Sequence, residues 1–305
     1  MPSLLSQGSI YRFGGEDGTR ALQTSLAYDL TRFTTSLSSS SDKGVGEWQR
    51  LAPMPTARGF AGAARLGDMV YVCGGFDKVP LADVERYSIK NNTWRTFTSM
   101  EVARSRHVVL SCAGFVYMLG GETQQETTAA CEVYDPRAGV WRDIAPMLVA
   151  RRNHAGVCFN SRLYVFGGDS SGSVECYSPS DNEWKALAPL PAPTSGARAV
   201  ALNGTCILVV GTSDAYMYHI DTNTWSRTSF ELPATISGFS LHDLDGLLVV
   251  AGGRGAGEFS SGTEGEQANL REARRKTYML NYRGWGGSWR QLPDLPEASN
   301  AAACV

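Results

Sequence analysis

The chain is constrained first by a repeat with a period of forty-odd residues. A tryptophan marks each unit, and the four inner spacings between these tryptophans run from 41 to 47 residues. An apolar run that ends in a glycine pair recurs in the same register, with a degenerate version, VVGT, around Gly211. Repeats of this length built from short apolar segments indicate an array of β-sheet blades. The tryptophans are Trp48, Trp94, Trp141, Trp184, Trp225 and Trp289, and the glycine pairs are Gly14-Gly15, Gly74-Gly75, Gly120-Gly121, Gly167-Gly168 and Gly252-Gly253.

One period divides into four expected strands, here called a to d, over residues 103–112, 115–121, 130–135 and 140–144. Strand b is almost wholly apolar, as a strand buried on both faces should be. Turn-forming sequences such as DPRAG separate the strands. In four units a tyrosine precedes the tryptophan by seven residues, and this fixed aromatic spacing suits packing between neighbouring blades. Six such units predict an all-β fold, a six-bladed propeller.

The two ends of the chain complement each other. Residues 9–15, SIYRFGG, form a strand b with no strand a before it, and residues 298–305 form a strand a with no strand b after it. We therefore expect residues 298–305 to pair with residues 9–15 and close the ring, which removes the open sheet edges that favour aggregation. This closure predicts a single propeller domain over residues 1–305.

Charge and hydropathy exclude several classes of partner. The 305 residues carry a net charge of −2, which points to no nucleic acid, and no apolar run approaches the roughly 18 residues of a membrane span. Residues 1–15 show no secretory signal. The seven cysteines are odd in number and form no C-x-x-C, so they are interpreted as small buried hydrophobes of a reducing compartment. We expect a monomeric propeller in the cytoplasm or the nucleus.

The motifs in each unit resemble the Kelch repeat over essentially the whole chain. The apolar-Gly-Gly, V-E-x-Y, tryptophan and P-M/L-P-x-x-R elements follow in register, as in GGFDKVPLADVERYSIKNNTWRTFTSMEVAR. Units five and six depart most, since Gly211 lacks its partner and either Leu280 or Tyr282 fills the aromatic position of the last strand c. The repeats look most like those of the BTB-Kelch substrate adaptors of cullin ubiquitin ligases. The resemblance implies a closed Kelch propeller that binds other proteins.

Strand direction alternates within a blade, which sorts the loops onto two faces. The b–c loops and the d–a junctions share one face, and in the family that this chain resembles this face grips a short segment of the substrate. Two insertions are long: residues 254–275 form a b–c loop on this face, and residues 31–47 form a c–d loop on the opposite face. Loops of this length are functional or mobile.

The d–a junctions collect arginines on one rim, although the chain is slightly acidic. A guanidinium fork matches a carboxylate or phosphate with two bonds, so we predict that this face binds an acidic or phosphorylated segment. Two competing interpretations exist: Arg58, Arg104 and Arg151 hold their turns by hydrogen bonds to carbonyls, or rim carboxylates such as Glu122 neutralise the field. The predicted partner-binding residues, with the two phenylalanines as apolar anchors, are Arg58, Phe60, Phe76, Asp77, Lys78, Arg104, Arg106, Gln124, Arg151, Arg152, Asn153, Ser170, Ser171 and Arg198.

No constellation of catalytic or metal-binding residues is recognisable. His107 and His154 occupy the same slot of adjacent units, which favours a structural role. The strand-c glutamates Glu85, Glu132 and Glu175 repeat with the blade, so we interpret them as scaffold rather than as an acid/base pair. No H-x-H, H-E-x-x-H, G-x-S-x-G or P-loop occurs. We expect no catalytic residue, no metal and no cofactor.

Two functional hypotheses from different classes remain. The first, which we favour, is a non-catalytic module that binds a protein or peptide. It includes a substrate receptor of a cullin ubiquitin ligase, which would need another chain or a missing region because no BTB or BACK region is recognisable, and it includes an actin or cytoskeletal scaffold. The second is a sugar-active enzyme, because bacterial sialic acid mutarotases are six-bladed Kelch propellers with an arginine and a carboxylate in the channel. Fold alone does not separate the two.

Overall fold

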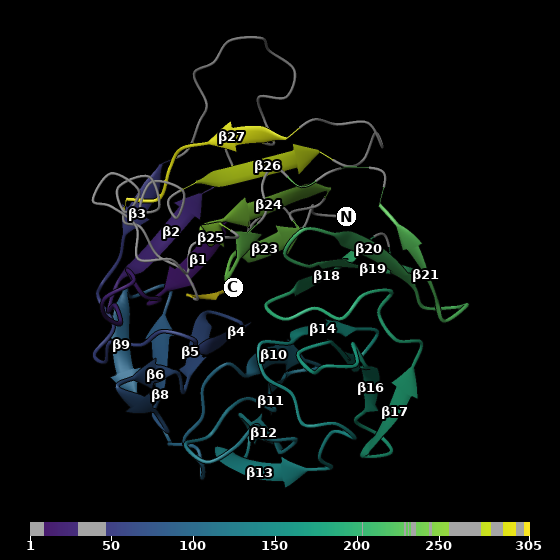
Figure 1. The fold of residues 1–305 in the computed structure, drawn as a ribbon. Coiled ribbons are helices and arrows are strands. Elements are labelled where there is room, and N and C mark those ends of the chain that lie inside the picture. Colours follow the sequence, from purple (N-terminus) through teal and green to yellow (C-terminus); the bar gives the residue numbers. More distant parts are fainter. Residues whose placement is uncertain are drawn as a thin grey trace, which may run out of the picture.

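Six four-stranded antiparallel sheets stand like blades around a central channel in the computed structural model of this protein (Figure 1). The structure describes residues 9–29, 47–202, 204–228, 230, 232, 236–243, 246–255, 276–281, 289–296 and 302–305. In each blade strand a lies at the channel and strand d at the periphery. The predicted all-β, six-bladed propeller is confirmed.

The first three blades carry the chain from its start to residue 144. Their strands a to d are β28 (Ala303–Cys304), β1 (Ser9–Phe13), β2 (Ser25–Asp29) and β3 (Trp48–Arg50) in blade 1; β4 (Gly62–Leu66), β5 (Met69–Cys73), β8 (Val84–Ser88) and β9 (Thr93–Thr96) in blade 2; and β10 (Val108–Cys112), β11 (Phe115–Leu119), β12 (Cys131–Asp135) and β13 (Val140–Ile144) in blade 3. Strand a of blade 3 therefore begins at Val108 rather than at residue 103, because residues 103–107 form the d–a junction.

The remaining blades follow the same order. Their strands are β14 (Ala155–Phe159), β15 (Arg162–Phe166), β16 (Val174–Ser178) and β17 (Glu183–Leu187) in blade 4; β18 (Arg198–Leu202), β19 (Cys206–Val210), β20 (Ala215–His219) and β21 (Thr224–Arg227) in blade 5; and β23 (Ser240–Asp243), β24 (Leu247–Ala251), β26 (Thr277–Asn281) and β27 (Arg290–Leu292) in blade 6. Two short pairs lie in the loops: β6 (Phe76–Asp77) with β7 (Val79–Pro80), and β22 (Ile236–Ser237) with β25 (Arg254–Gly255).

The chain closes as the sequence predicts. Strand β28 pairs antiparallel with β1, with Cys304 opposite Arg12 and Ala303 opposite Phe13. Tyr11 and Val305 exchange two backbone hydrogen bonds, of 2.9 and 3.0 Å between nitrogen and oxygen. The last residues thus supply strand a of blade 1, and residues 298–301 of the predicted segment lie outside the described residues.

The core lies between neighbouring blades. The repeated Tyr–Trp pairs stand opposite each other on strands c and d of one blade, as with Tyr87 and Trp94 at a centroid distance of 5.0 Å. The indole N–H of Trp94 donates a hydrogen bond to Ala52 O at 2.8 Å and so connects the blade to the segment that follows the preceding blade. In blade 6 the aromatic position is filled by the buried Leu280, opposite Leu248.

The cysteines divide into two groups. Cys73, Cys131 and Cys176 are buried free thiols, as predicted. The expectation that no disulfide forms is wrong for Cys112 and Cys158, which are joined with their Cα atoms 5.6 Å apart. The strands a of neighbouring blades converge on the channel, so cysteines about one repeat apart in sequence come within bonding reach.

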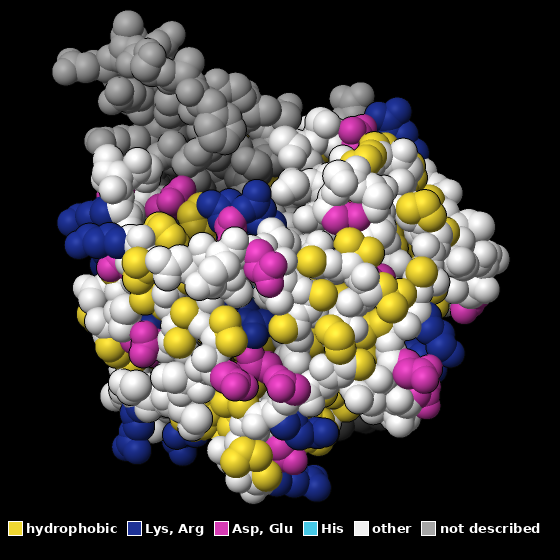
Figure 2. Space-filling view, turned by 60° about the horizontal axis from the view of Figure 1, so that its bottom comes forward, with side chains coloured by type: hydrophobic (Ala, Val, Ile, Leu, Met, Phe, Trp, Pro, Cys, Tyr) yellow, Lys and Arg dark blue, Asp and Glu magenta, His cyan; other side chains and the backbone are white. Residues whose placement is uncertain are grey.

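Charge is dispersed over the side of the molecule that Figure 2 draws. Basic, acidic and hydrophobic side chains are interspersed on this side, and neither sign of charge forms a continuous block. Among the residues that the structure describes, no helix has the length and apolar character that crossing a membrane requires.

Candidate functional site

The b–c loops and d–a junctions meet on one face, as strand alternation predicts. Gly59 forms an antiparallel bridge with Phe76, and Ser105 forms one with Glu122, each joining a d–a junction to a b–c loop. In blade 2 the b–c loop is a small hairpin, β6–β7, that turns at Lys78. These contacts fix the backbone that surrounds the channel mouth.

Three residues at the channel mouth share an unusual backbone conformation. Phe60, Arg106 and Asn153 occupy equivalent positions and have φ values of 54°, 58° and 51°. Each lies two residues after the buried arginine of its d–a junction. Non-glycine residues seldom adopt this left-handed region, because the Cβ atom crowds the backbone. Blades 5 and 6 place glycine at the same position, Gly196 and Gly238. The fold therefore accepts glycine there, and the three side chains persist at a cost in strain, which is a feature of functional sites.

Backbone hydrogen bonds connect these positions from blade to blade. Arg106 N donates to Phe60 O at 2.9 Å, Asn153 N to Arg106 O at 2.9 Å, and Gly196 N to Asn153 O at 2.7 Å. We call Phe60, Arg106 and Asn153 the mouth residues. Their backbone is held rigidly, so their side chains are presented to the channel mouth with little freedom to rearrange.

The two exposed arginines on the rim share a single carboxylate. Arg106 Nε lies 3.0 Å from one oxygen of Glu122, and Arg152 Nη1 pairs with the other oxygen. The Arg106 guanidinium also lies over the ring of Phe60, 4.4 Å from its centroid, a cation–π contact. Two positive charges therefore face one negative charge, and a second anion would balance the group.

Arg58, Arg104 and Arg151, three of the predicted binding residues, are buried and cannot touch a partner in this structure. Arg58 and Arg104 pair with Glu85 and Glu132 of strand c, at 3.1 and 2.6 Å between nitrogen and oxygen. Arg58 Nη1 also donates to Gly74 O at 2.8 Å. The prediction that these arginines contact a partner is therefore wrong, and the alternative, that they hold their turns, is correct. Each guanidinium donates to carbonyls of the turn and pairs with a glutamate on strand c of its own blade.

The other predicted residues are spread over the same face. Phe76 and Val79 of the hairpin are exposed apolar side chains, and Lys78 and Gln124 line the channel mouth beside them. Asp77 lies in the hairpin away from the channel lining. Ser170 and Ser171 do not line the channel either. The backbone N–H and the hydroxyl of Ser171 donate hydrogen bonds to Asp169 in the same loop.

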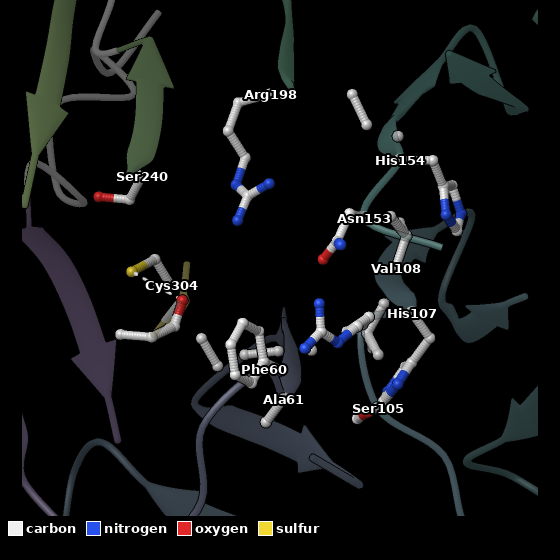
Figure 3. A pocket seen from close by; sticks show the side chains of 18 of the residues that line it. Phe60, Ala61, Ser105, His107, Val108, Asn153, His154, Arg198, Ser240 and Cys304 are labelled. Atoms are coloured by element: carbon white, nitrogen blue, oxygen red, sulfur yellow. Dashed lines mark hydrogen bonds between the residues drawn. The ribbon is translucent and has the colours of Figure 1, made fainter. Parts of the chain in front are cut away.

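A channel of about 1180 Å³ runs through the middle of the ring. Arg198, predicted to lie on the rim, is instead the first residue of β18 and extends into this channel, with Asn153 and Phe60 on other sides of the opening (Figure 3). Among the described residues, no group of three or more histidine, cysteine, aspartate or glutamate side chains is placed to hold a metal ion. The channel therefore offers a basic, polar cavity rather than a cluster of metal ligands.

Comparison with known proteins identifies the repeat. The Kelch motif family matches residues 57–101, 103–148 and 150–191. The chain is a Kelch-repeat β-propeller. The matched segments are blades 2 to 4, and these are the blades in which a buried arginine meets a strand-c glutamate.

Curated relatives of this Kelch propeller include Kelch-like proteins and a scruin. Kelch-like protein 35 of Mus musculus is 28% identical over 83% of this chain and 47% of the relative. Kelch-like protein 21 of Danio rerio is 38% identical over 68% of the chain and 34% of the relative, and Beta-scruin of Limulus polyphemus is 23% identical over 64% and 17%. The chain thus spans less than half of the length of each of these relatives. The solved structure of YjhT superposes with a TM-score of 0.70 at 15% identity, covering 93% of this chain and 98% of that one, a likeness of fold alone.

Sequence reasoning missed two lining residues of the Kelch channel, His242 and Cys304. His242 belongs to β23 of blade 6. This is one of the two blades whose sequence departs most from the repeat, so its residues are hard to align. Cys304 belongs to β28, the terminal strand that the sequence assigns to the inner position of blade 1, but the cysteines were interpreted only as buried hydrophobes.

Three histidines lie around the Kelch channel: His107 and His154 are buried, and His242 is half-buried. Burial lowers the pKa of His107 to about 3, and the charge of Arg104 adds to this effect. Burial likewise lowers the pKa of His242 to about 4, helped by Arg12. The pKa of His154 is also held well below its ordinary value by burial. All three rings are therefore neutral at pH 7.

Lowering the pH should destabilise this Kelch propeller because the histidines around the channel have lowered pKa values in the folded state. Because the unfolded histidines titrate near 6.5 and the folded ones far lower, the unfolded state takes up protons first as the pH falls. Stability is complete above pH 6.5 and is lost below it, at about 1.4 kcal/mol per pH unit for each of these rings. Urea midpoints at pH 7.5 and 5.5 measure the loss, which His107→Gln should reduce. His219→Gln, at a ring that bonds Ser226 near the surface, is the control, and equal losses in both variants would contradict the prediction.

Proposed function

We propose that this Kelch propeller is a non-catalytic protein-recognition module that binds an acidic or phosphorylated segment of a partner on the b–c/d–a face. The observation that carries the proposal is the set of mouth residues, Phe60, Arg106 and Asn153, held in a left-handed backbone that glycine would adopt without strain. Side chains kept at a position where two other blades place glycine support a role in binding for these residues.

The charges on this face favour an anionic segment. Arg106 and Arg152 share Glu122, with exposed side-chain fractions of 35% and 47%. Both are therefore accessible to solvent while one of their two charges is unbalanced. A carboxylate or phosphate of the partner would accept hydrogen bonds from the guanidinium groups and supply the missing negative charge. Lys78, exposed on the hairpin, adds a further cation nearby.

Apolar contacts complete the proposed surface. Phe76 is 39% exposed and Val79 is 50% exposed, and both lie on the hairpin that flanks the basic residues. Large apolar side chains beside charged groups are the usual anchors of a peptide-binding site. The mixture predicts a segment in which an acidic or phosphorylated residue lies next to a hydrophobic one.

The Kelch-like relatives support an interaction module and suggest its setting. On this resemblance we extend the proposal to a substrate receptor of a cullin ubiquitin ligase, in which another chain, or a region outside this sequence, contacts the ligase components. An actin or cytoskeletal scaffold belongs to the same class of function. Affinity capture followed by mass spectrometry distinguishes these settings by the proteins that are recovered.

Replacing both rim arginines should abolish binding and leave the fold intact. In the variant Arg106→Gly with Arg152→Ala, glycine keeps the left-handed backbone of residue 106 without strain. Losing desolvated charge contacts costs about 2–5 kcal/mol, so affinity should fall at least about thirtyfold. The measurement uses fluorescence anisotropy on an array of peptides with Asp, Glu, phosphoserine or phosphothreonine, each matched to an alanine peptide.

Two controls separate recognition from stability. Arg95→Ala removes an exposed arginine from β9, on the outer strand of blade 2, and should leave affinity unchanged. The melting temperature of the double variant should stay close to that of the parent protein. If the double variant binds as well as the parent, or unfolds, the two arginines are scaffold and the proposed surface is wrong.

The enzyme hypothesis finds less support in the channel. Its described lining holds two carboxylates, Glu16 and Glu122, both at the mouth, and Glu122 is paired with two arginines. A general acid or base needs a carboxylate or histidine that can reach a substrate proton. A mutarotase assay over a panel of sugars tests this alternative, and turnover that depends on Arg198 would favour it over the recognition module.

A further inference from the structure

Arg198 is out of pattern among the residues that begin strand a. In the other blades this position is small or apolar, so the fold does not need a cation there. The equivalent residues are Gly62, Val108, Ala155, Ser240 and Ala303. The side chain of Arg198 extends into the channel, as Figure 3 shows.

The guanidinium of Arg198 has no counter-charge among the described residues. Its one hydrogen bond runs from Nη1 to the carbonyl of the preceding residue, Ala197, at 2.8 Å. By contrast, Arg58, Arg104 and Arg151 each meet a glutamate, and Arg106 and Arg152 share one. Burial is the largest cause of the lowered pKa of Arg198; the neighbouring Cys304 opposes this shift, and Arg12 adds to it. A partly desolvated cation without a partner costs free energy that an anion would recover.

The channel as a whole is electropositive, although the chain carries net charge −2. Its lining includes four basic residues, Arg65, Lys78, Arg106 and Arg198, against the two acidic ones, Glu16 and Glu122. The histidines around the channel are neutral and do not offset this balance. A narrow cavity lined by one sign of charge concentrates ions of the opposite sign.

A second donor stands across the channel from Arg198. The side-chain amide of Asn153 points into the opening (Figure 3) and makes no hydrogen bond with the described residues. Asn153 is held by the blade-to-blade backbone bonds on both sides, so its amide is already positioned. A guanidinium fork and an amide N–H are the donors that a carboxylate or phosphate group accepts from.

We propose that Arg198 and Asn153 form an anion-binding site in the channel that takes a single carboxylate or phosphate group. The site is separate from the rim arginines, whose charges are already shared with Glu122. It shares Asn153 with the mouth residues, whereas its cation, Arg198, is not one of them. The anion is either a free small molecule or an acidic side chain that enters the channel from a bound segment.

The test uses calorimetric titration with inorganic phosphate and, separately, with succinate, at constant ionic strength. Both anions should bind the parent protein and the control variant Arg95→Ala, at an exposed arginine of the outer strand β9, with similar affinity. The rim variant Arg106→Gly with Arg152→Ala removes positive charge from the channel lining and should weaken both anions by less than Arg198→Met does. Arg198→Met should lose at least about tenfold in affinity, because it removes the fork and the charge together, and Arg198→Lys should fall between the two. Arg198→Met is expected to fold, since it releases a cation that has no partner, and its melting temperature checks this.

The outcomes are distinct. If Arg198→Met binds phosphate and succinate as tightly as the parent, or if the parent binds neither, the proposal is wrong. If an acidic peptide loses affinity on Arg198→Met as well as on the rim variant, the anion comes from a bound segment; if only phosphate and succinate are affected, it is a free small molecule. Failure of the rim variant to weaken peptide binding contradicts the recognition module and leaves the channel site standing.

Discussion

Replacing Arg151 with methionine is expected to destabilise the propeller by about 3–5 kcal/mol, whereas the same change at its neighbour Arg152 should cost less than about 0.5 kcal/mol. Arg151 is fully buried, pairs with Glu175 and donates to Gly167 O at 2.7 Å. Its loss leaves the buried carboxylate of Glu175 without a counter-charge and removes a donor from the turn carbonyls. Arg152 is exposed, and water replaces its contact with Glu122.

Urea unfolding of the two variants measures the difference. A rescue variant covers the case in which Arg151→Met fails to fold. Glu175 also accepts hydrogen bonds from the backbone N–H groups of Leu148 and Val149, at 2.7 and 3.1 Å. Glu175→Gln keeps an acceptor for them and removes the uncompensated charge, so Arg151→Met with Glu175→Gln should regain part of the lost stability. Similar midpoints for Arg151→Met and Arg152→Met would refute the scaffold role of the buried arginine.

Deleting residues 302–305 is expected to cost about 4 kcal/mol or more and to promote oligomers. Each strand hydrogen bond contributes about 1 kcal/mol, and Ala303 packs in the apolar cluster between blades 1 and 2. The truncated ring presents the inner edge of β1 to solvent, and an unpaired edge is a template for association. Thermal unfolding and light scattering measure the two effects.

A single substitution isolates the hydrogen bonding of the closure. Val305→Pro removes the N–H that donates to Tyr11 O at 3.0 Å, while Val305→Ala keeps it and removes little volume. The proline variant should therefore be the less stable of the two. A truncated protein that melts with the full chain would show that the last strand does not close the ring.

Much of the fold could be predicted because each blade must satisfy the same physical constraints, so the same residue types recur in every repeat. The glycine pairs are an example: a Cβ atom at Gly74, where φ is +56°, would lie 2.4 Å from the carbonyl oxygen of Arg104 in the next blade. Glycine is required at this position of the blade, so it recurs along the sequence, and the number of recurrences indicates the number of blades. The boundary of strand a was predicted five residues too early in blade 3, because the left-handed turn at Arg106 leaves no mark in an apolar pattern.

The candidate site was predicted only in part, for a different reason. Arg104 and Arg106 are two residues apart and chemically identical, yet one is buried against Glu132 and the other is 35% exposed at the rim. Sequence reasoning places both on the correct face and offers turn-holding for Arg104 as an alternative to binding, but it does not decide between the two. The same limit applies to Arg198, predicted on the rim and found in the channel.

The sequence by itself determined the architecture: six blades, their strand order and the pairing of the last strand with the first. These follow from periodic, local constraints, namely the apolar runs, the glycine pairs and the aromatic spacing, which each repeat states independently. Only the tertiary structure decided which arginines are scaffold and which are free to bind. That distinction depends on distance from the channel axis and on a glutamate that is some 24 to 28 residues away in the chain, across the blade. Burial and pairing of a charge are properties of the assembled ring, so no single repeat contains them.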